Sequence, residues 1–171
     1  IFSDPAPVPE GTRLRVIHEL SHAIGTRAGM VGGQVVDLAT TGQTADAATV
    51  DYIHAAKTGA FIRSAVRSGA IYAGAPEEDV ARLTTYGEKI GLAFQIADDL
   101  LDVTGSQAAM GKAVHKDGQQ QKATYPAVHG VEESGRIAAR LIDEGCWALE
   151  PYGSRAQRLR EIAHFLITRN T

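Results

Sequence analysis

The 171-residue chain has one tryptophan and one cysteine, and the single cysteine, Cys146, excludes a disulfide within the chain. One thiol is typical of a reducing compartment, so we expect a cytoplasmic protein. The net charge is also small, and the formal value of −3 is too close to neutral to indicate general binding to nucleic acids. No apolar run approaches the ~20 residues of a membrane-spanning helix, and the start does not read as a signal peptide. We therefore expect neither a nucleic-acid partner nor a membrane span.

The sequence also lacks stretches that alternate apolar and polar residues over a useful length, which argues against strands. Hydrophobic residues make up 44% of the chain, enough for the core of one globular domain. Apolar spacing, prolines and glycines predict helices over about 12–24, 28–39, 47–72, 77–103, 124–129, 132–150 and 156–168. We expect an irregularity at Thr58-Gly59 and a polar loop over 105–122. The fold class is therefore all-α, a bundle of antiparallel helices.

Three aspartates lie close together near the end of the 77–103 helix, which is otherwise apolar on nearly every side. At about 100° per residue, Asp98 and Asp102 share a face with Gln95, whereas Asp99 points elsewhere. A helix of this kind belongs inside a protein, and carboxylates directed inward are costly unless something neutralises them. Mg²⁺ is a natural partner because it takes oxygen ligands and bridges to phosphates. The alternative is a helix end whose acids lie in solvent.

The helix over 28–39 contains Gly29, Gly32 and Gly33, and each glycine weakens a helix by about 1 kcal/mol relative to alanine. That cost is tolerated where another helix or a ligand must approach the backbone closely. Gln34 and Asp37 are three residues apart and share a face, which places an amide donor beside a carboxylate acceptor. The alternative is helix packing at the glycines, with Gln34 and Asp37 as buried hydrogen-bonding groups. The two interpretations are compatible.

Lysines stand out at two places. Lys57 lies among small and apolar residues next to Thr58, and an ammonium beside a hydroxyl suits phosphate oxygens. The alternative is a surface lysine whose stem packs on the helix. The predicted loop over 105–122 carries three lysines, among them Lys112 and Lys116, against one aspartate. An acidic helix followed by a basic loop predicts a diphosphate clamp, and the alternative is a solvated loop without a ligand.

One short motif indicates a different protein. His18, Glu19 and His22 match HExxH, which is typical of a zinc-peptidase helix. The longer form of that motif has a third histidine where this chain has Ala28. The two histidines lie opposite the apolar stripe of their helix, so we interpret them as solvent-exposed. That stripe consists of Val16, Ile17, Leu20, Ala23 and Ile24. A zinc peptidase that uses His18, Glu19 and His22 is the lesser alternative.

Taken together, these segments resemble the trans-isoprenyl diphosphate synthases, the family of farnesyl and geranylgeranyl diphosphate synthases. The matching segments follow the family's order over most of the chain: Gly33-Gln34 through Asp37, Lys57-Thr58-Gly59, Phe94-Gln95 through Asp102, Gly111-Lys112, Lys116-Asp117 and Lys122-Ala123-Thr124-Tyr125-Pro126. Each segment is weak alone, and the set is specific. The segment that ends at Asp102 corresponds to the family's second aspartate-rich motif.

The resemblance implies the all-α isoprenoid synthase fold and a Mg²⁺-dependent prenyltransferase. Its substrates are isopentenyl diphosphate and an allylic prenyl diphosphate, and a homodimer is implied as well. The implied site residues are Lys57, Thr58 and Gln95 for catalysis; Gln34, Lys57, Thr58, Lys112 and Lys116 for substrate binding; and Asp98, Asp99 and Asp102 for the metal.

The chain departs from the family pattern because the first aspartate-rich motif and the basic segment that holds isopentenyl diphosphate are absent. In the family both lie upstream, and this chain opens on Ile1-Phe2 without an initiator methionine. We therefore expect residues 1–171 to be the C-terminal part of one polyprenyl synthase domain, inactive in prenyl transfer alone. A non-catalytic synthase-like subunit is a further alternative. Product length is not predicted, because the residues that set it lie mostly beside the first motif.

Overall fold

The computed structural model describes residues 8–110 and 123–168, and the side chains of all of these except 105–110. Its elements are the α-helices α1 (Glu10–Ala23), α2 (Met30–Thr40), α3 (Ala47–His54), α4 (Ala60–Tyr72), α5 (Glu77–Met110), α6 (Tyr125–His129), α7 (Val131–Ala148) and α8 (Gln157–Thr168), the π-helical turn η1 (Ala55–Gly59) and the 3₁₀-helical segment η2 (Glu150–Ala156). These residues contain no strand, so the all-α prediction is confirmed.

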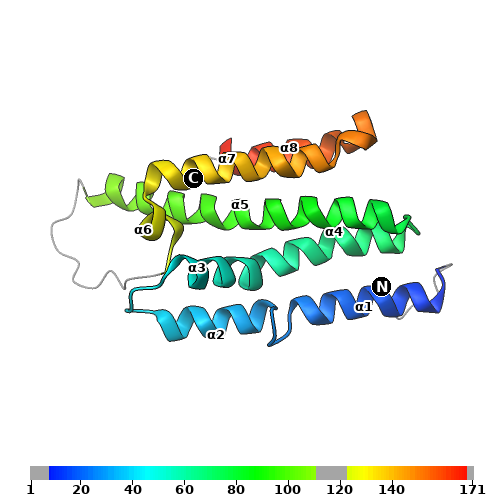
Figure 1. Cartoon of the computed structure of the whole chain (residues 1–171), viewed down its shortest axis with the longest axis horizontal. Helices are drawn as coiled ribbons and strands as arrows, with labels where there is room; N and C mark the ends of the chain where they lie inside the picture. The colour runs from blue at the N-terminus through cyan, green and yellow to red at the C-terminus, as the bar shows by residue number, and fades with distance from the viewer. Residues whose placement is uncertain (1–7, 111–122, 169–171) are drawn as a thin grey trace.

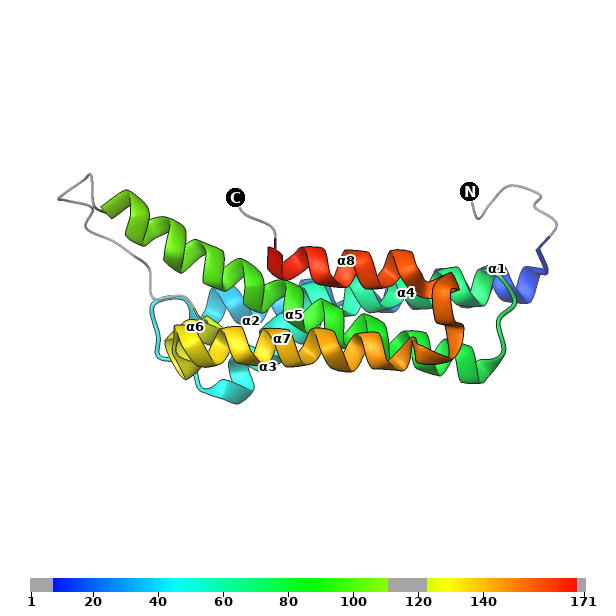
Figure 2. The same cartoon turned by 90° about the horizontal axis from the view of Figure 1, so that it is seen from above.

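The helices lie side by side with their directions alternating (Figure 1). α1 and α2 run end to end along one edge, and α3, η1 and α4 form the next rod. α5 follows, packed most extensively against α4 on one side and α7 on the other. Figure 2 shows α8 on the opposite side of the bundle from α6 and α3, and it shows the end of α5 projecting beyond its neighbours. α5 is therefore the central helix of the bundle.

α3, η1 and α4 form one continuous helix over residues 47–72 that widens into a π-helical turn near its middle. Asp46 caps the start of this helix by accepting a hydrogen bond from the Thr49 amide at 2.8 Å. π-helical turns are rare and frequently occur at functional sites. The irregularity predicted at Thr58-Gly59 is thus confirmed, and its form is a π turn.

α5 supplies the centre of the main hydrophobic core. Tyr86, Ile90, Ala93 and Ile96 are each at most 3% exposed. They belong to a cluster of buried residues that includes Leu141, Ile142, Ala163 and Leu166 of α7 and α8. The Tyr86 hydroxyl donates to the Leu159 carbonyl at 2.7 Å, and burial raises the pKa of Tyr86 to about 12. Burying one large apolar side chain contributes about 1.5–3 kcal/mol, so this cluster fixes α5 on α7 and α8.

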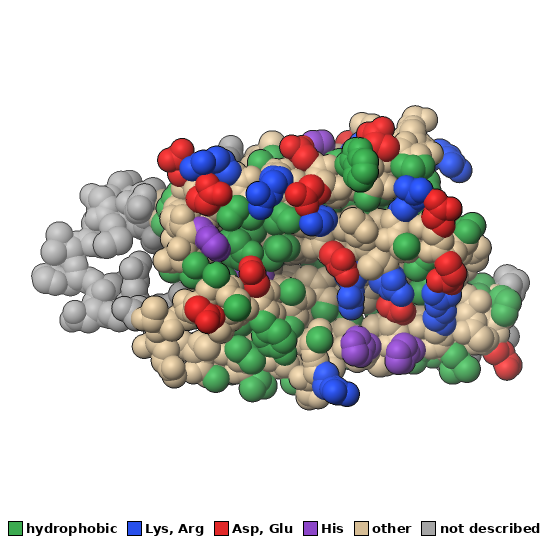
Figure 3. Space-filling view, in the orientation of Figure 1, with side chains coloured by type: hydrophobic (Ala, Val, Ile, Leu, Met, Phe, Trp, Pro, Cys, Tyr) green, Lys and Arg blue, Asp and Glu red, His purple; other side chains and the backbone are tan. Residues whose placement is uncertain are grey.

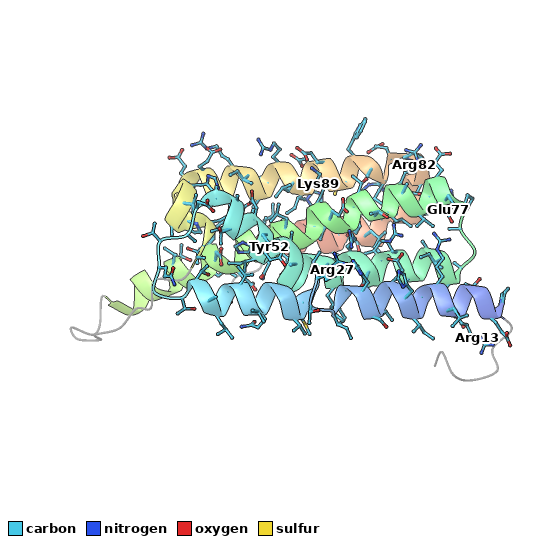
Figure 4. The ribbon with its side chains drawn as sticks, turned by 60° about the horizontal axis from the view of Figure 1, so that its bottom comes forward. Arg13, Arg27, Tyr52, Glu77, Arg82 and Lys89 are labelled. Atoms are coloured by element: carbon cyan, nitrogen blue, oxygen red, sulfur yellow. The ribbon has the colours of Figure 1, made fainter. Side chains whose placement is uncertain are left out.

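α1 packs mainly against α4. The apolar stripe predicted to be the core face of α1 is therefore only partly buried, and that prediction is partly wrong. Val16 and Ala23 are buried, whereas Ile17 is 42% exposed and Ile24 is 45% exposed. A single neighbouring helix covers only a narrow strip of another helix. An ion pair also joins α1 to the start of α5. Arg15 donates to the two carboxylate oxygens of Glu77, which Figure 4 labels, at 2.5 and 2.9 Å.

α5 continues beyond the end predicted at Val103, so the predicted loop over 105–122 is wrong for residues 105–110. Residues 106–110 include alanine, glutamine and methionine, which are good helix formers and outweigh the roughly 1 kcal/mol cost of Gly105. Lys112 and Lys116 lie outside the described residues. Within the described part of the chain, no helix is both long and apolar enough to span a membrane.

Candidate functional site

Gly33 lets α2 lie directly against the π-helical turn. A Cβ atom on Gly33 would lie 2.4 Å from the backbone nitrogen of Lys57, so any side chain there requires the backbone to move. The contact brings Asp37 of α2 beside the Lys57 side chain, whose Nζ donates to Asp37 Oδ2 at 2.7 Å. The two side chains are 34% and 24% exposed, so the ion pair is half-buried. The close approach of another helix is confirmed at Gly33, where that helix is η1, whereas Gly29 and Gly32 lie close to the backbone of residues 22–26.

The opposite side of η1 lies against α5. A Cβ atom on Gly91 would lie 2.8 Å from the Gly59 Cα, so the two backbones are in direct contact. One residue earlier in η1, Thr58 Oγ1 donates to Gln95 Oε1 at 3.0 Å. The π turn is thus held between α2 and α5, with the Lys57 side chain bonded to α2 and Thr58 bonded to α5. Three predicted site residues from two distant segments meet here.

Asp98 and Asp102 continue the face of α5 that begins with Gln95. Asp98 is half-buried and Asp102 is exposed. On α2, the half-buried Gln34 lies next to Gly33. Carboxylates one helical turn apart offer hard oxygen ligands, so this donor set fits Mg²⁺, which usually takes one or two carboxylates together with substrate phosphates. Among the residues that the structure describes, no group of three or more His, Cys, Asp or Glu side chains could hold a metal.

Asp99 lies on a different side of α5, as its place on the helix predicts. Its Oδ2 is 2.9 Å from His54 Nε2 and accepts a hydrogen bond from the backbone N–H of Tyr125, also at 2.9 Å. The Tyr125 hydroxyl donates to Asp51. Burial, followed by this hydrogen bond, raises the pKa of Tyr125 well above its ordinary value.

His54 is a residue of this region that the sequence motifs do not predict. The available signal was a histidine one turn before Lys57 on a helix rich in apolar residues. In the structure it is only 3% exposed. Nothing local in the sequence pairs it with Asp99, because the two residues belong to different helices.

His18, Glu19 and His22 lie at a surface hollow between α1 and α4. The two histidines are exposed with ring centroids 6.2 Å apart, and Figure 3 shows histidines, cations and carboxylates gathered on this face. Arg67 donates to both carboxylate oxygens of Glu19 at 2.8 and 2.7 Å, and these bonds lower the pKa of Glu19. A carboxylate tied to a guanidinium is a poor general base, so this geometry does not favour the zinc-peptidase alternative.

The family model for polyprenyl synthetase matches residues 9–145. The chain belongs to this family. It is 46% identical over 163 residues to a dimethylallyltranstransferase of Fischerella ambigua (strain UTEX 1903), covering 95% of this chain and 47% of that relative. It is 40% identical over 172 residues to the farnesyl diphosphate synthase of Escherichia coli (strain K12), covering 98% of this chain and 57% of that relative. The chain thus spans about half the length of the curated relatives it matches.

Solved structures of the same family share the fold. An FPP/GFPP synthase from Zymomonas mobilis is 37% identical with a TM-score of 0.79, over 92% of this chain and 52% of that chain. A geranyltransferase from Helicobacter pylori, complexed with magnesium and isoprenyl diphosphate, is 26% identical with a TM-score of 0.72, over 96% of this chain and 54% of that chain. The family and the isoprenoid synthase fold predicted from the motifs are both confirmed.

Proposed function

We propose that this protein is a prenyltransferase that condenses isopentenyl diphosphate with an allylic prenyl diphosphate. The observation that carries the proposal is the contact of η1 with α2 and α5, where Lys57 and Thr58 meet Asp37 and Gln95. The acidic residues predicted to bind metal follow directly on α5. A cation, a hydroxyl and carboxylates held in one region are the groups that stabilise a departing diphosphate. The relatives, a dimethylallyltranstransferase and a farnesyl diphosphate synthase among them, support this reaction class.

In this proposal, Lys57 and Thr58 contact the allylic substrate near the C–O bond that breaks. The ion pair with Asp37 holds the Lys57 ammonium in place, and Gln95 accepts from Thr58 and so orients its hydroxyl. Gln34 faces the same substrate from α2. The C–O electrons leave with the diphosphate, the double bond of isopentenyl diphosphate attacks the allylic carbon, and a proton is then lost. No protein nucleophile is needed.

Asp98 and Asp102 are the residues that we propose to hold Mg²⁺. When bound, Mg²⁺ neutralises the negative charge of the diphosphate. Lys112 and Lys116 are proposed to grip the same diphosphate from another side. Asp99, the third predicted metal ligand, has a different environment, with His54 and the Tyr125 amide as its partners.

We also propose a homodimer in the cytoplasm. The homodimer rests on the family resemblance, and the apolar side chains exposed on α1 and α2, such as Leu14 at 65%, Val35 at 58% and Leu38 at 66%, need further helices of the same domain or of a second copy to cover them. Surfaces of this kind mark interaction sites. The location is supported by the single cysteine, Cys146, which is free. Light scattering on the purified protein tests the dimer, and a monodisperse monomer would contradict it.

The test of the function is product formation from isopentenyl and geranyl diphosphates in Mg²⁺ buffer, with the protein expressed from its full reading frame. Asp98→Ala is expected to lower kcat by at least 100-fold, because it removes a proposed metal ligand. Asp143→Ala, which removes an exposed carboxylate of α7, is the matched control. Absence of product from the wild-type protein, with retained binding of geranyl diphosphate, would support the non-catalytic subunit instead.

A further inference from the structure

Asp99 has an environment that a metal ligand would not require. Its side chain is 16% exposed, and one oxygen, Oδ2, receives both His54 Nε2 from α3 and the Tyr125 N–H from α6, each at 2.9 Å. A charge-assisted hydrogen bond of this kind is stronger than a neutral one. The carboxylate therefore connects α5 to α3, which precedes it in the chain, and to α6, which follows it.

The partners of Asp99 are themselves held in place. His54 is 3% exposed, and its Nδ1 is 2.8 Å from the Val50 carbonyl oxygen, so both ring nitrogens face acceptors. The Tyr125 ring lies edge-on to the His54 ring with centroids 5.2 Å apart. The hydroxyl of Tyr125 donates to Asp51 of α3. Both ring nitrogens of the buried His54, and both the amide and the hydroxyl of Tyr125, thus have partners, and networks of this kind favour a single arrangement.

Asp99 lies in the second half of α5, the helix whose end projects beyond the other helices (Figure 2). Core contacts of α5 continue through the fully buried Ile96 to the partly buried Leu100, and the network adds a polar contact with α3 and α6 between them. Around the helix, Asp98 is about 100° from Asp99 and Asp102 is about 60° from it. Holding Asp99 against α3 and α6 therefore sets the direction of both neighbouring carboxylates.

We propose that Asp99 is a positioning residue: the His54 ring and the Tyr125 amide hold its carboxylate, and this contact orients Asp98 and Asp102 of α5 towards the metal and the diphosphate. The proposal rests on the proposed function for what Asp98 and Asp102 do. A positioning role requires Asp99 to supply a hydrogen-bond acceptor, whereas a ligand role requires it to supply negative charge to the metal.

The contact itself is tested by hydrogen exchange at the Tyr125 amide, which needs no catalysis. Asp99→Ala is expected to speed exchange at this amide at least tenfold, because its acceptor is lost. Asp99→Asn keeps a carbonyl oxygen that can accept from the Tyr125 amide, so protection should return to within threefold of the wild-type protein. Asp98→Asn, the matched control, should leave protection at Tyr125 unchanged. Wild-type exchange in Asp99→Ala would overturn the proposal.

The positioning role is tested by rescue. Asp99→Ala is expected to lower kcat at least tenfold, and Asp99→Asn should recover most of that loss with an unchanged Mg²⁺ requirement. Asp98→Asn should not recover the loss of Asp98→Ala, because a ligand needs the carboxylate. If Asp99→Asn is as impaired as Asp99→Ala while Tyr125 stays protected, Asp99 is a metal ligand and the proposal is wrong.

The two proposals fail in different ways. If the wild-type protein forms no product, the proposed function fails, and exchange at Tyr125 still decides whether the contact exists. Binding of Mn²⁺, followed by electron paramagnetic resonance, then replaces turnover. Weaker Mn²⁺ binding in Asp98→Asn but not in Asp99→Asn supports the positioning role. Equal weakening in both variants refutes it.

Discussion

Gly33→Ala probes the contact between α2 and the π-helical turn with a single methyl group. The new Cβ would lie 2.4 Å from the Lys57 backbone nitrogen and 2.8 Å from its Cα. These atoms belong to the backbone of a packed helix, so they cannot rotate away as the end of a flexible side chain can. The substitution must move α2 away from η1, and this motion stretches the Lys57–Asp37 ion pair.

The expected free-energy change is a sum of opposed effects. Alanine is better than glycine in a helix by about 1 kcal/mol. Overpacking costs about 1–3 kcal/mol, and the upper end applies because both blocking atoms are backbone. Weakening the half-buried Lys57–Asp37 pair costs about 1 kcal/mol or less. The net loss in the free energy of unfolding is about 2–3 kcal/mol, which lowers Tm by about 4–12 °C for a chain of this length.

Thermal unfolding followed by circular dichroism measures this shift, and Gly69→Ala is the matched control. Gly69 also lies inside a helix, but a Cβ there meets nothing within 4 Å. The control should therefore gain about 1 kcal/mol and raise Tm by about 2–4 °C. Affinity for geranyl diphosphate should fall in Gly33→Ala and stay unchanged in the control. Equal stabilisation of both variants would refute the close-contact reasoning.

Two further predictions concern the face between α1 and α4. Replacing His18 and His22 together with Ala should leave turnover and metal content nearly unchanged, because both rings are exposed; loss of bound zinc on elemental analysis would contradict this. Glu19→Gln should cost about 1 kcal/mol at pH 7, because it breaks the bidentate pair with Arg67. The pair lowers the pKa of Glu19 below its ordinary 4.5, so its contribution is present above that pH and is lost as the pH falls through the folded-state pKa. The stability gap between variant and wild type, measured by urea unfolding, should therefore narrow as the pH falls below 4.5, and a gap that does not narrow at any acid pH would count against the pair.

The helices were predictable because their signals are local. Apolar spacing, prolines and glycines placed the helices within a few residues, and the irregularity at Thr58-Gly59 was expected from glycine in an otherwise regular helix. The end of α5 was missed because Gly105 reads as a stop, and its helical continuation depends on the residues after it. Exposure of Ile17 was missed for another reason: a stripe shows which face of a helix is apolar, but the neighbouring helices decide how much of it is covered.

The site was only partly predictable because its contacts join distant segments. The spacing of Asp98 and Asp102 on one face follows from helix geometry alone. The bond from Thr58 to Gln95 and the one from His54 to Asp99 depend on how α3, η1 and α5 pack, and no spacing within a helix encodes that. The order of the motifs indicates the family and therefore which residues form the site. The contact between Asp99 and His54 is visible only in the folded structure.

The π-helical turn gives this helix one more residue than a regular α-helix of the same register would hold. Because a π turn accommodates that residue locally, the segments before and after it keep the facing of a regular helix. Deleting one residue from η1 would therefore let the turn relax to a regular α-helix, and buried Ser64 and Ser68 of α4 would keep their places in the bundle. Deleting one residue within α4 would instead rotate everything after it by about 100°. We therefore expect a single-residue deletion in η1 to preserve the bundle while it removes the widened turn that carries Lys57 and Thr58.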